Sequence, residues 1–446
     1  MIDQMIRKSD DQMITATSTD PKATVLPLLE GSTWPGAAEA LAQAQILPIP
    51  TSKTEAWKYT ALDALGERDY LRRATAAVPQ LDATALIPAL EADRIVFVNG
   101  VYQPTLSSIT AQAGVRVVNF RSANSGDRAT IDQALGRLSA EGDSPFAVLN
   151  GCWLDDGVLL HLDAGVRAKR AVHVVHVGAP QPQPFAHAQR LLAVLGRGAD
   201  VDLVEQFVDL PDAGESLVTG LTELRVGEGA RIGHYRLHAE DERAIHIGAV
   251  HVELARDARC EGLLFALGST LKRIDLRLHH RGRGASCRLD GIYLARHHEH
   301  VDLHTAIEHE VAHADTTQVY RGIIDDAARA VFNGRIHIHP QAQKSNADLS
   351  NRNLLLSNEA EVDTKPELEI YADDVRCSHG ATVSRIEEKG LYYLLTRGIG
   401  RREAEVLLGY GFVNELVSRV GNDALAAALR DVVRDWLGRP GGGALS

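Results

Sequence analysis

The chain is poor in aromatic residues and carries an excess of acidic ones. Phe, Trp and Tyr make up 5% of its 446 residues, which argues against a stacking platform for single-stranded nucleic acid. Aspartate and glutamate number 59 against 47 lysines and arginines, so the net charge is −12. This charge argues against a nucleic-acid surface and against a polybasic membrane patch. The 45% apolar and 24% charged residues are otherwise typical of a globular protein.

Long apolar runs and paired cysteine motifs are also missing. The longest strongly apolar runs, such as 95–98 and 191–195, are much shorter than the ~18 residues that a membrane helix needs. Residues 1–21 are polar and lack the apolar core of a signal peptide, so we predict a disordered leader. The four cysteines, at positions 152, 260, 287 and 377, form no CxxC pair. We therefore expect reduced thiols and a cytoplasmic location.

Short β-rich runs alternate with Gly, Asp or Asn from residue 146 to about 390, and no helical stretch of normal length interrupts them after Gly196. This pattern argues against a βαβ fold and leaves a sandwich, barrel or solenoid. A loose three-residue repeat decides among these folds. It consists of a small residue, then a polar residue, then a small or apolar residue. Its third positions are Ile232, Cys260, Cys287, Ala330, Val362 and Cys377. The first three are 28 and 27 residues apart, whereas Asp315 breaks the pattern at the next step. Stacked coils of two strands give such a spacing, so we predict a mainly β fold with a parallel β-helix over 146–390.

Residues 22–145 are predicted to form helices in the first part of the region and a mixture of strands and helices in the second part. A helix is expected to begin close to the segment 53–60, which contains two large aromatic side chains. We interpret this segment as an anchor that packs on the next domain. The later elements expected here are a hairpin over 95–102 around Asn99-Gly100, a strand over 115–120 and a short helix over 131–140.

Two amphipathic helices are predicted within a C-terminal helical domain over 391–438, followed by a flexible tail over 439–446. The first apolar stripe consists of Ala404, Leu407, Leu408, Gly411, Phe412 and Leu416. The second consists of Leu425, Leu429, Val432, Val433, Trp436 and Leu437, with Asn422 or Asp423 as its cap. These helices either close one open end of the solenoid or present a surface to a partner.

Cys377 and His379 are two residues apart and therefore share one face of an expected strand. A thiolate beside an imidazole suits a soft or borderline metal, or a sulfur-handling site. The repeat, however, aligns Cys377 with the other small third positions, which favours a buried structural cysteine. His379 is harder to bury without a partner and is the better functional candidate, although a histidine satisfied by a hydrogen bond is the alternative.

Histidine is abundant between residues 279 and 339, where ten of the 19 histidines lie. A metal site is one interpretation, and a stand-alone metal-binding protein is a competing function. There is no HExxH motif, and strand alternation scatters these residues over both faces. His298 with His300, and His337 with His339, can each share a face. Solvated strand faces are the default interpretation.

Catalytic signatures are not evident in the sequence. It contains neither a phosphate-binding loop ending in GK[ST] nor a GxSxG elbow. The acidic pairs Asp325-Asp326 and Asp373-Asp374 are explained by turn chemistry. A β-helix enzyme, such as a lyase or an acyltransferase, is a competing class, but the strict hexapeptide repeat of the acyltransferases is absent. We therefore expect that the chain is not an enzyme.

Several segments together resemble one protein family. They are 55–60 (EAWKYT), 97–100 (FVNG), 321–334 (RGIIDDAARAVFNG), 343–357, 364–370 (TKPELEI), 374–382 (DVRCSHGAT) and 393–399. These segments resemble the SufB/SufD family, the β-helical scaffold subunits of the SUF iron–sulfur cluster assembly machine. The resemblance spans roughly residues 50–420 and is most specific in its C-terminal motifs.

Within this family the chain is more similar to the SufD type. Residues 378–382 read SHGAT where SufB-type chains typically carry a run like EHEAT, so Gly380 replaces a carboxylate. An N-terminal cysteine-rich motif of many SufB chains is also missing. The resemblance implies a right-handed parallel β-helix flanked by helical regions, and a non-catalytic scaffold role in cluster assembly and iron acquisition.

The resemblance also implies partners and a site. A SufB-like paralogue is expected to pair through the β-helix, and the isolated chain could instead form a homodimer. The ABC-type ATPase SufC is expected to dock on the C-terminal helices, and the candidate contacts are Leu407, Leu408, Phe412 and Leu416. His379, together with Cys377, is expected near the SufB interface, where a transient iron–sulfur cluster is shared. No cofactor is expected on the isolated chain.

Overall fold

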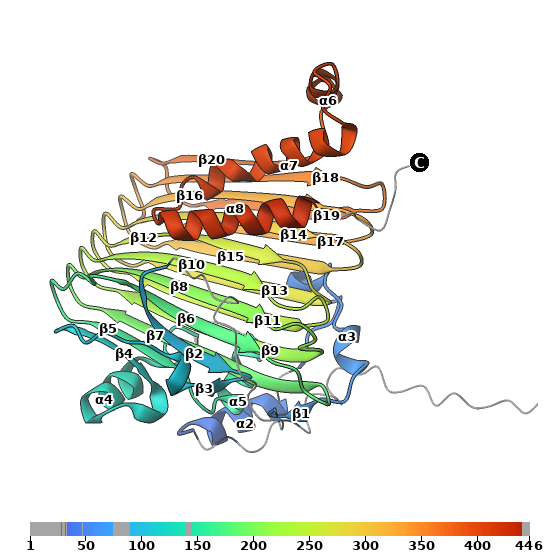
Figure 1. Cartoon of the computed structure of the whole chain (residues 1–446). Helices are drawn as coiled ribbons and strands as arrows, with labels where there is room; N and C mark the ends of the chain where they lie inside the picture. The colour runs from blue at the N-terminus through green and yellow to red at the C-terminus, as the bar shows by residue number, and fades with distance from the viewer. Residues whose placement is uncertain are drawn as a thin grey trace, which may run out of the picture.

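In the computed structural model, the chain folds into a parallel β-solenoid with helices along its sides (Figure 1). The structure describes residues 28, 32, 34–46, 48–74, 90–139 and 144–438. The predicted leader over 1–21 and the predicted tail over 439–446 lie outside the described residues. None of the described helices is long and apolar enough to cross a membrane.

Two ten-stranded sheets form the walls of the solenoid. Sheet A contains β1 (Leu71–Arg72), β4 (Val115–Asn119), β5 (Val158–Leu162), β7 (Phe185–Leu195), β9 (Ser216–Val226), β11 (Ile245–Leu254), β13 (Leu271–His280), β15 (His300–His309), β17 (Arg329–Ile338) and β19 (Glu361–Ile370). Sheet B contains β2 (Ala92–Val98), β3 (Val101–Tyr102), β6 (Ala171–Gly178), β8 (Asp200–Asp209), β10 (Arg231–Ala239), β12 (Arg259–Leu267), β14 (Ser286–Ala295), β16 (Asp315–Ile324), β18 (Asn346–Leu355) and β20 (Arg376–Arg385). From β5 to β20 each strand pairs in parallel with the next but one, which confirms the predicted coils of two strands.

The register of sheet B explains the sequence repeat and corrects part of it. One cross-strand column on the inner face consists of Ile232, Cys260, Cys287, Thr316, Ala347 and Cys377. The alignment of Cys377 with the two earlier cysteines is therefore confirmed. Ala330 and Val362 belong instead to sheet A, where they pair with each other. These two residues were assigned to the wrong sheet because strands of both sheets begin with similar small residues. An alignment that is shifted by one strand therefore fits the sequence equally well.

The interior of the solenoid is filled by inward-facing side chains of both sheets, which form one continuous apolar core. Two tyrosines fit inside because each lies over a glycine of the adjacent strand. Gly291 pairs with Tyr320, and Gly322 pairs with Tyr293. A Cβ atom at these glycines would lie 2.1 and 2.2 Å from the tyrosine rings, so no larger residue fits without displacing them.

The corners that precede sheet B strands require a left-handed backbone. The residues at these corners are Gly229, Asp257, Gly284, His313 and Lys344, with φ between 55° and 77°. Glycine adopts this conformation without strain, whereas the other residue types tolerate it at some cost. His313 therefore occupies a corner position in the fold, and the His-rich stretch is not one continuous face.

The N-terminal region packs on the outer face of sheet A. The apolar cluster there joins Trp57 and Leu65 to Leu217, Ile245 and Leu271. Trp57 is 6% exposed, and the guanidinium of Arg273 lies 3.9 Å from its ring centroid. The predicted anchor is thus confirmed, but the helix expected at 53–60 is wrong, because only one 3₁₀ turn, Glu55–Trp57, forms.

The other N-terminal elements agree with the predicted ones in type more than in their bounds. The helices are α2 (Ala37–Ile46), α3 (Asp63–Gly66), α4 (Ser125–Ala134) and α5 (Pro145–Trp153), with short 3₁₀ turns at Pro104–Leu106 and Phe120–Ser122. The expected hairpin forms between β2 and β3, with Asn99 and Gly100 both at positive φ. Since β2 and β4 join sheets B and A, both sheets begin before residue 146.

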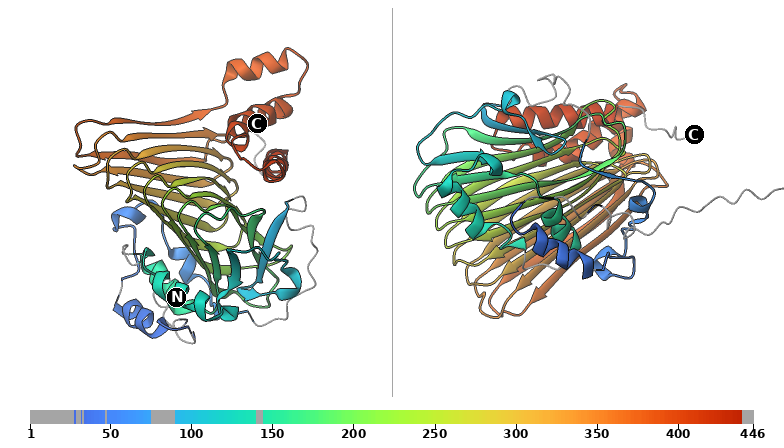
Figure 2. Two further views of the ribbon diagram at one scale, coloured as in Figure 1. Left: turned by 90° about the vertical axis from the view of Figure 1, so that its left-hand side faces the viewer. Right: turned by 90° about the horizontal axis from the view of Figure 1, so that it is seen from below.

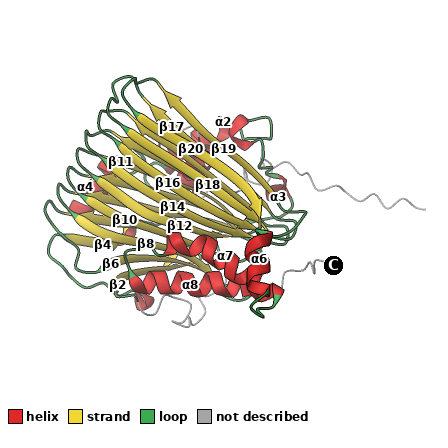
Figure 3. Ribbon diagram, turned by 90° about the horizontal axis from the view of Figure 1, so that it is seen from above, coloured by secondary structure: helices red, strands yellow, loops and turns green. Residues whose placement is uncertain are grey.

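The C-terminal helices α7 (Arg401–Val417) and α8 (Asp423–Gly438) lie along the outer face of sheet B (Figures 1 and 3). They share an apolar cluster with strands from β8 to β18, so they cover the side of the solenoid and do not close its end. The stripe predicted for α8 is largely buried, and Asn422 caps this helix by accepting from the amide of Leu425 at 3.0 Å.

The stripe predicted for α7 is correct only in part, since Ala404 and Leu416 are fully buried but the other members are not. The buried face consists of Ala404, Gly409, Val413, Leu416 and Val417. Leu407 is 46% exposed, and Leu408 and Phe412 are half-buried. Helix α6 (Glu388–Leu395) projects beyond the sheets (Figure 2, left) and exposes Tyr392 and Tyr393.

Candidate functional site

The last turn of the solenoid is open on one side. Strands β19 and β20 end their sheets, and each pairs only with the strand of the preceding turn. Among the described residues nothing covers these edges, and most side chains of β20 are exposed. Ile370, Tyr371 and Val383 are apolar or aromatic side chains that remain 42–62% exposed here. An uncovered edge of unpaired backbone groups is a surface on which another strand can pair.

Cys377 lies in β20 at the end of the inner column. It pairs with Ala347 of β18, is half-buried, and contacts the interior apolar core. Burial raises the pKa of its thiol, although a hydrogen bond from the backbone at Ala347 partly opposes this. The thiol is therefore not activated by its own chain. Its position agrees with the structural interpretation while leaving the thiol reachable from the open end.

His379 follows on the same face of β20 and is exposed. It pairs in register with Leu349, and no hydrogen bond or ion pair joins its imidazole to the described part of the chain. A Cβ atom on the neighbouring Gly380 would point to the opposite face of the strand and would meet nothing within 4 Å, so that face is open as well. The structure thus brings one free imidazole and one half-buried thiol together at the end of the solenoid. These two groups supply at most half of the four ligands that an iron–sulfur cluster usually takes.

The other cysteines are interior packing groups. Cys260 and Cys287 are adjacent in the inner column, and burial raises the pKa of Cys287 to about 12 and that of Cys260 further. Cys287 lies 3.3 Å from the hydroxyl of Thr316, which also contacts the buried imidazoles of His280 and His309 at 3.0 and 2.8 Å. These thiols remain protonated and inaccessible at neutral pH.

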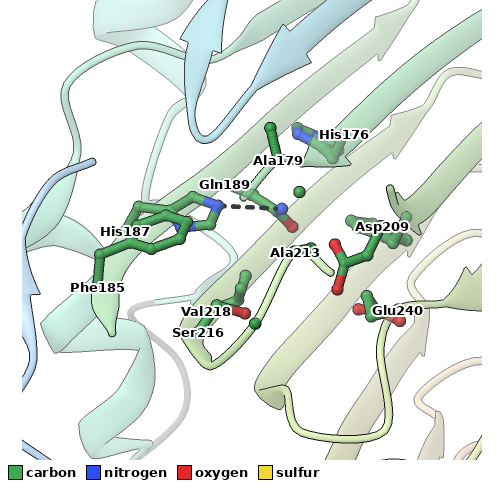
Figure 4. A pocket seen from close by; sticks show the side chains of 13 residues that line it. His176, Ala179, Phe185, His187, Gln189, Asp209, Ala213, Ser216, Val218 and Glu240 are labelled. Atoms are coloured by element: carbon green, nitrogen blue, oxygen red, sulfur yellow. Dashed lines mark hydrogen bonds between the residues drawn. The ribbon is translucent and has the colours of Figure 1, made fainter. Parts of the chain in front are cut away.

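A small pocket opens into the interior between β6, β7, β8 and β9 (Figure 4). Asp209 and Glu240 line one side, and His176, His187 and Gln189 line the other. Burial lowers the pKa of His176 to about 4 and that of His187 to about 3, so both imidazoles are neutral at pH 7. Neither Nδ1 atom has a hydrogen-bond partner in the described part of the chain.

Behind this pocket lies a buried charged network that the sequence did not reveal. Glu240 contacts Nδ1 of His246 at 2.6 Å, Nδ1 of His238 at 3.3 Å, and Nζ of Lys272 at 2.8 Å. Burial alone would raise the pKa of Glu240, but Lys272 and the two imidazoles lower it well below its ordinary value. Glu240, His238 and His246 have the spacing of metal ligands, yet Lys272 already neutralises the carboxylate, so we interpret them as a buried ion-pair network. One feature of the sequence pointed to this network: polar residues recur at the alternate positions of β10 whose side chains face the interior.

Comparison with known proteins identifies the family. The model described as "SUF system FeS cluster assembly, SufBD core domain" matches residues 177–412, and "SufBD protein N-terminal region" matches 36–174. The chain belongs to the SufBD family. It is 33% identical over 395 residues to the iron–sulfur cluster assembly protein SufD of Escherichia coli, covering 88% of this chain and 90% of that protein. It is 24% identical over 407 residues to SufD of Bacillus subtilis, covering 89% and 92%.

The SufBD core match includes the open end of the solenoid and most of α7, whereas α8 lies beyond it. A SufBD-family protein of Synechocystis is also 28% identical over 410 residues, 89% of each chain. The structure confirms the solenoid expected from the resemblance, and the family match places this chain in SUF iron–sulfur cluster assembly.

The four thiols should differ sharply in reactivity. We expect N-ethylmaleimide to modify Cys377 in the native protein, while Cys152, Cys260 and Cys287 react only after unfolding, because these three are buried and have raised pKa values. Mass spectrometry of the labelled protein measures this. Cys377→Ser should abolish native labelling and Cys152→Ser should leave it unchanged; modification of Cys260 or Cys287 without unfolding would contradict the interior assignment.

Asp209 should make stability depend on pH. Burial, together with the charges of Glu240 and Asp241, raises its pKa from 3.8 to about 7, although the amide of Asp241 donates to it at 2.8 Å. The folded state therefore keeps a proton that the unfolded chain has released. The stabilisation from this proton is fully present below about pH 4 and is lost as the pH rises to about 7. We expect its loss to lower the free energy of unfolding by roughly 2–4 kcal/mol.

The comparison of wild type with Asp209→Asn isolates this effect. Urea unfolding at pH 4, 5.5 and 7 should show the wild type losing stability relative to the variant as the pH rises. The buried histidines act in the opposite direction, because their lowered pKa values favour the folded state at higher pH. Their contribution is common to both proteins and cancels when the free energy of unfolding of the variant is subtracted from that of the wild type. A difference that does not change with pH would show that Asp209 ionises normally in the folded protein.

Proposed function

We propose that this chain is a non-catalytic, SufD-like scaffold subunit that completes an iron–sulfur cluster site together with a SufB-like paralogue. The observation that carries the proposal is the exposed β20 edge, where His379 follows Cys377 on the inner face and has no hydrogen-bond partner in the described part of the chain. A subunit that offers one imidazole and one half-buried thiol requires further ligands from elsewhere. A SufB-like subunit is the natural source, because a related solenoid would present a similar open end.

Pairing through the open end is supported by the backbone and by apolar contacts. Strands β19 and β20 have free hydrogen-bonding edges, and the exposed Ile370, Tyr371 and Val383 lie beside them. Two such edges placed together would satisfy the backbone groups that each leaves unpaired. In the absence of the paralogue, a second copy of this chain offers the same edge, so a homodimer is the expected substitute.

The cluster at this interface is proposed to be transient and shared, with none on the isolated chain. His379 would supply an imidazole, Cys377 a second group, and the partner the remaining thiolates. Mixed imidazole and thiolate ligation is known for iron–sulfur centres and alters their reduction potential. The raised pKa of Cys377 supports His379 as the more important of the two.

A non-catalytic role is supported by where the perturbed groups lie. The residues with strongly shifted pKa values, such as Glu240, His238 and Asp302, are buried in ion pairs or hydrogen bonds, and these three lie away from the open end of the solenoid. At the open end, by contrast, His379 is exposed and has no hydrogen-bond or ion-pair partner in the described part of the chain. This arrangement fits a subunit that positions ligands and contributes to iron acquisition.

The ABC-type ATPase SufC is proposed to dock on α6 and the exposed face of α7. Leu407 projects there, with Leu408 and Phe412 half-buried beside it. Tyr392 and Tyr393 of α6 are 70% and 55% exposed, so this helix presents two large aromatic side chains at the surface. Leu416, the fourth candidate contact, is fully buried against sheet B and so stabilises α7 without reaching a partner.

His379→Ala tests the cluster site. In the complex purified with SufB-like and SufC-like partners, we expect iron and sulfide per complex to fall roughly tenfold, because a ligand of the shared site is lost. His298→Ala, which removes another exposed imidazole, is the matched control. An unchanged cluster yield in His379→Ala, with the complex intact, would remove this residue from the site.

Two charge substitutions should separate the two interfaces. Leu407→Asp is expected to lower co-purification of the SufC-like ATPase at least tenfold, whereas Val383→Asp is expected to weaken capture of the SufB-like paralogue. Each side chain is 46% exposed, so neither change should lower the melting temperature appreciably. Loss of the same partner from both variants, or of neither partner, would contradict the proposed separation.

A further inference from the structure

A row of alternating carboxylates and imidazoles crosses the outer face of sheet A. Its members, from five successive strands, are Glu253, His279, Glu308, His337 and Glu369. Each residue is the cross-strand neighbour of the next, and all five are half-buried. The row ends on β19, the last strand of the sheet. It was invisible in the sequence because its members are 26 to 32 residues apart.

Three ligand groups converge at one point of this row. Nδ1 of His337 lies 2.8 Å from Oε2 of Glu308, and Nε2 of His339 lies 3.0 Å from the same oxygen. The two imidazoles come from one face of the β17 segment, and their ring centroids are 4.2 Å apart. The three ligand atoms all lie within 4.8 Å of one another.

These separations suit a metal ion with ligands at right angles. Protein nitrogen and oxygen ligands lie about 2.1 Å from a bound transition metal. Two ligands at right angles around such an ion are therefore about 3.0 Å apart, close to the observed 2.8 and 3.0 Å. Two imidazoles and one carboxylate on one side of an ion leave the other positions open to water or to an exchanging ligand.

The surrounding charges hold the carboxylate in place and leave the site net negative. Arg335 donates to Oε1 of Glu308 at 2.7 Å, so Oε2 remains directed at the imidazoles. Glu369 binds the same guanidinium through both of its oxygens at 2.8 Å. Arg335 also lies 3.1 Å from Nδ1 of His337, but its single positive charge is opposed by two carboxylates.

We propose that Glu308, His337 and His339 form a binding site for a divalent first-row transition-metal ion on the outer face of sheet A. Imidazole ligands favour such ions over calcium or magnesium, which prefer oxygen. Arg335 and Glu369 orient the carboxylate as positioning residues. This site goes beyond the proposed scaffold role, because it belongs to this chain alone and lies on the other sheet from His379.

Titration of the purified full-length chain with Co²⁺ tests the site. We expect one equivalent to bind with a visible absorption band that Zn²⁺ displaces. His337→Ala/His339→Ala should weaken this binding by about 100-fold or more, since two of three ligands are lost. Glu308→Gln is the second variant, and it keeps the proposal testable if the double variant does not fold.

The controls separate this site from adventitious binding and from the cluster site. His298→Ala/His313→Asn removes two exposed imidazoles of the same stretch, with asparagine chosen for the positive φ of His313, and should bind Co²⁺ like the wild type. His379→Ala should also bind one equivalent unchanged, whatever its effect on cluster yield. Unchanged affinity in both site variants, or an equal loss in the histidine control, would overturn the proposal.

Discussion

Parallel strand pairing between successive turns is the interaction on which the rest of this structure depends. Each strand from β7 to β18 satisfies its backbone groups with the strand one turn before and the strand one turn after it. The same register sets the inner side chains of successive turns above one another, so Cys260 lies over Cys287 and each of two tyrosines lies over a glycine. Because pairing propagates by one turn at a time, the last turn necessarily presents an unsatisfied edge.

The interior of the solenoid and the outer face of sheet A show how the same residue types serve different purposes. Inside, Glu240 is enclosed with two imidazoles and Lys272, and its charge is neutralised by a buried amine. Outside, Glu308 meets two imidazoles at the surface and is held by an arginine that is shared with a second carboxylate. Burial makes the first arrangement a closed structural network, whereas water can reach the second. Exposure and charge balance, more than ligand spacing, distinguish the two.

The helices complete the architecture by covering one wall and leaving the end free. Helices α7 and α8 bury their apolar faces on sheet B, and the N-terminal segments cover part of sheet A. Neither group caps β19 and β20 in the described part of the chain. The open end, the exposed α6 and the outer row therefore remain available for partners or ions, which suits a family that functions in iron–sulfur cluster assembly.

The sequence by itself determined the solenoid, the hairpin at Asn99-Gly100 and the family, because each rests on local spacing or on contiguous motifs. It also aligned Cys377 with Cys260 and Cys287, since the same three-residue pattern ends at each of these cysteines. The tertiary structure decided which face of α7 is buried, because α7 has apolar side chains on more than one face and it is Val413, not Leu407, that packs on sheet B. It also decided that Glu308, His337 and His339 meet, since strand register brings together residues that sequence spacing leaves about one coil apart.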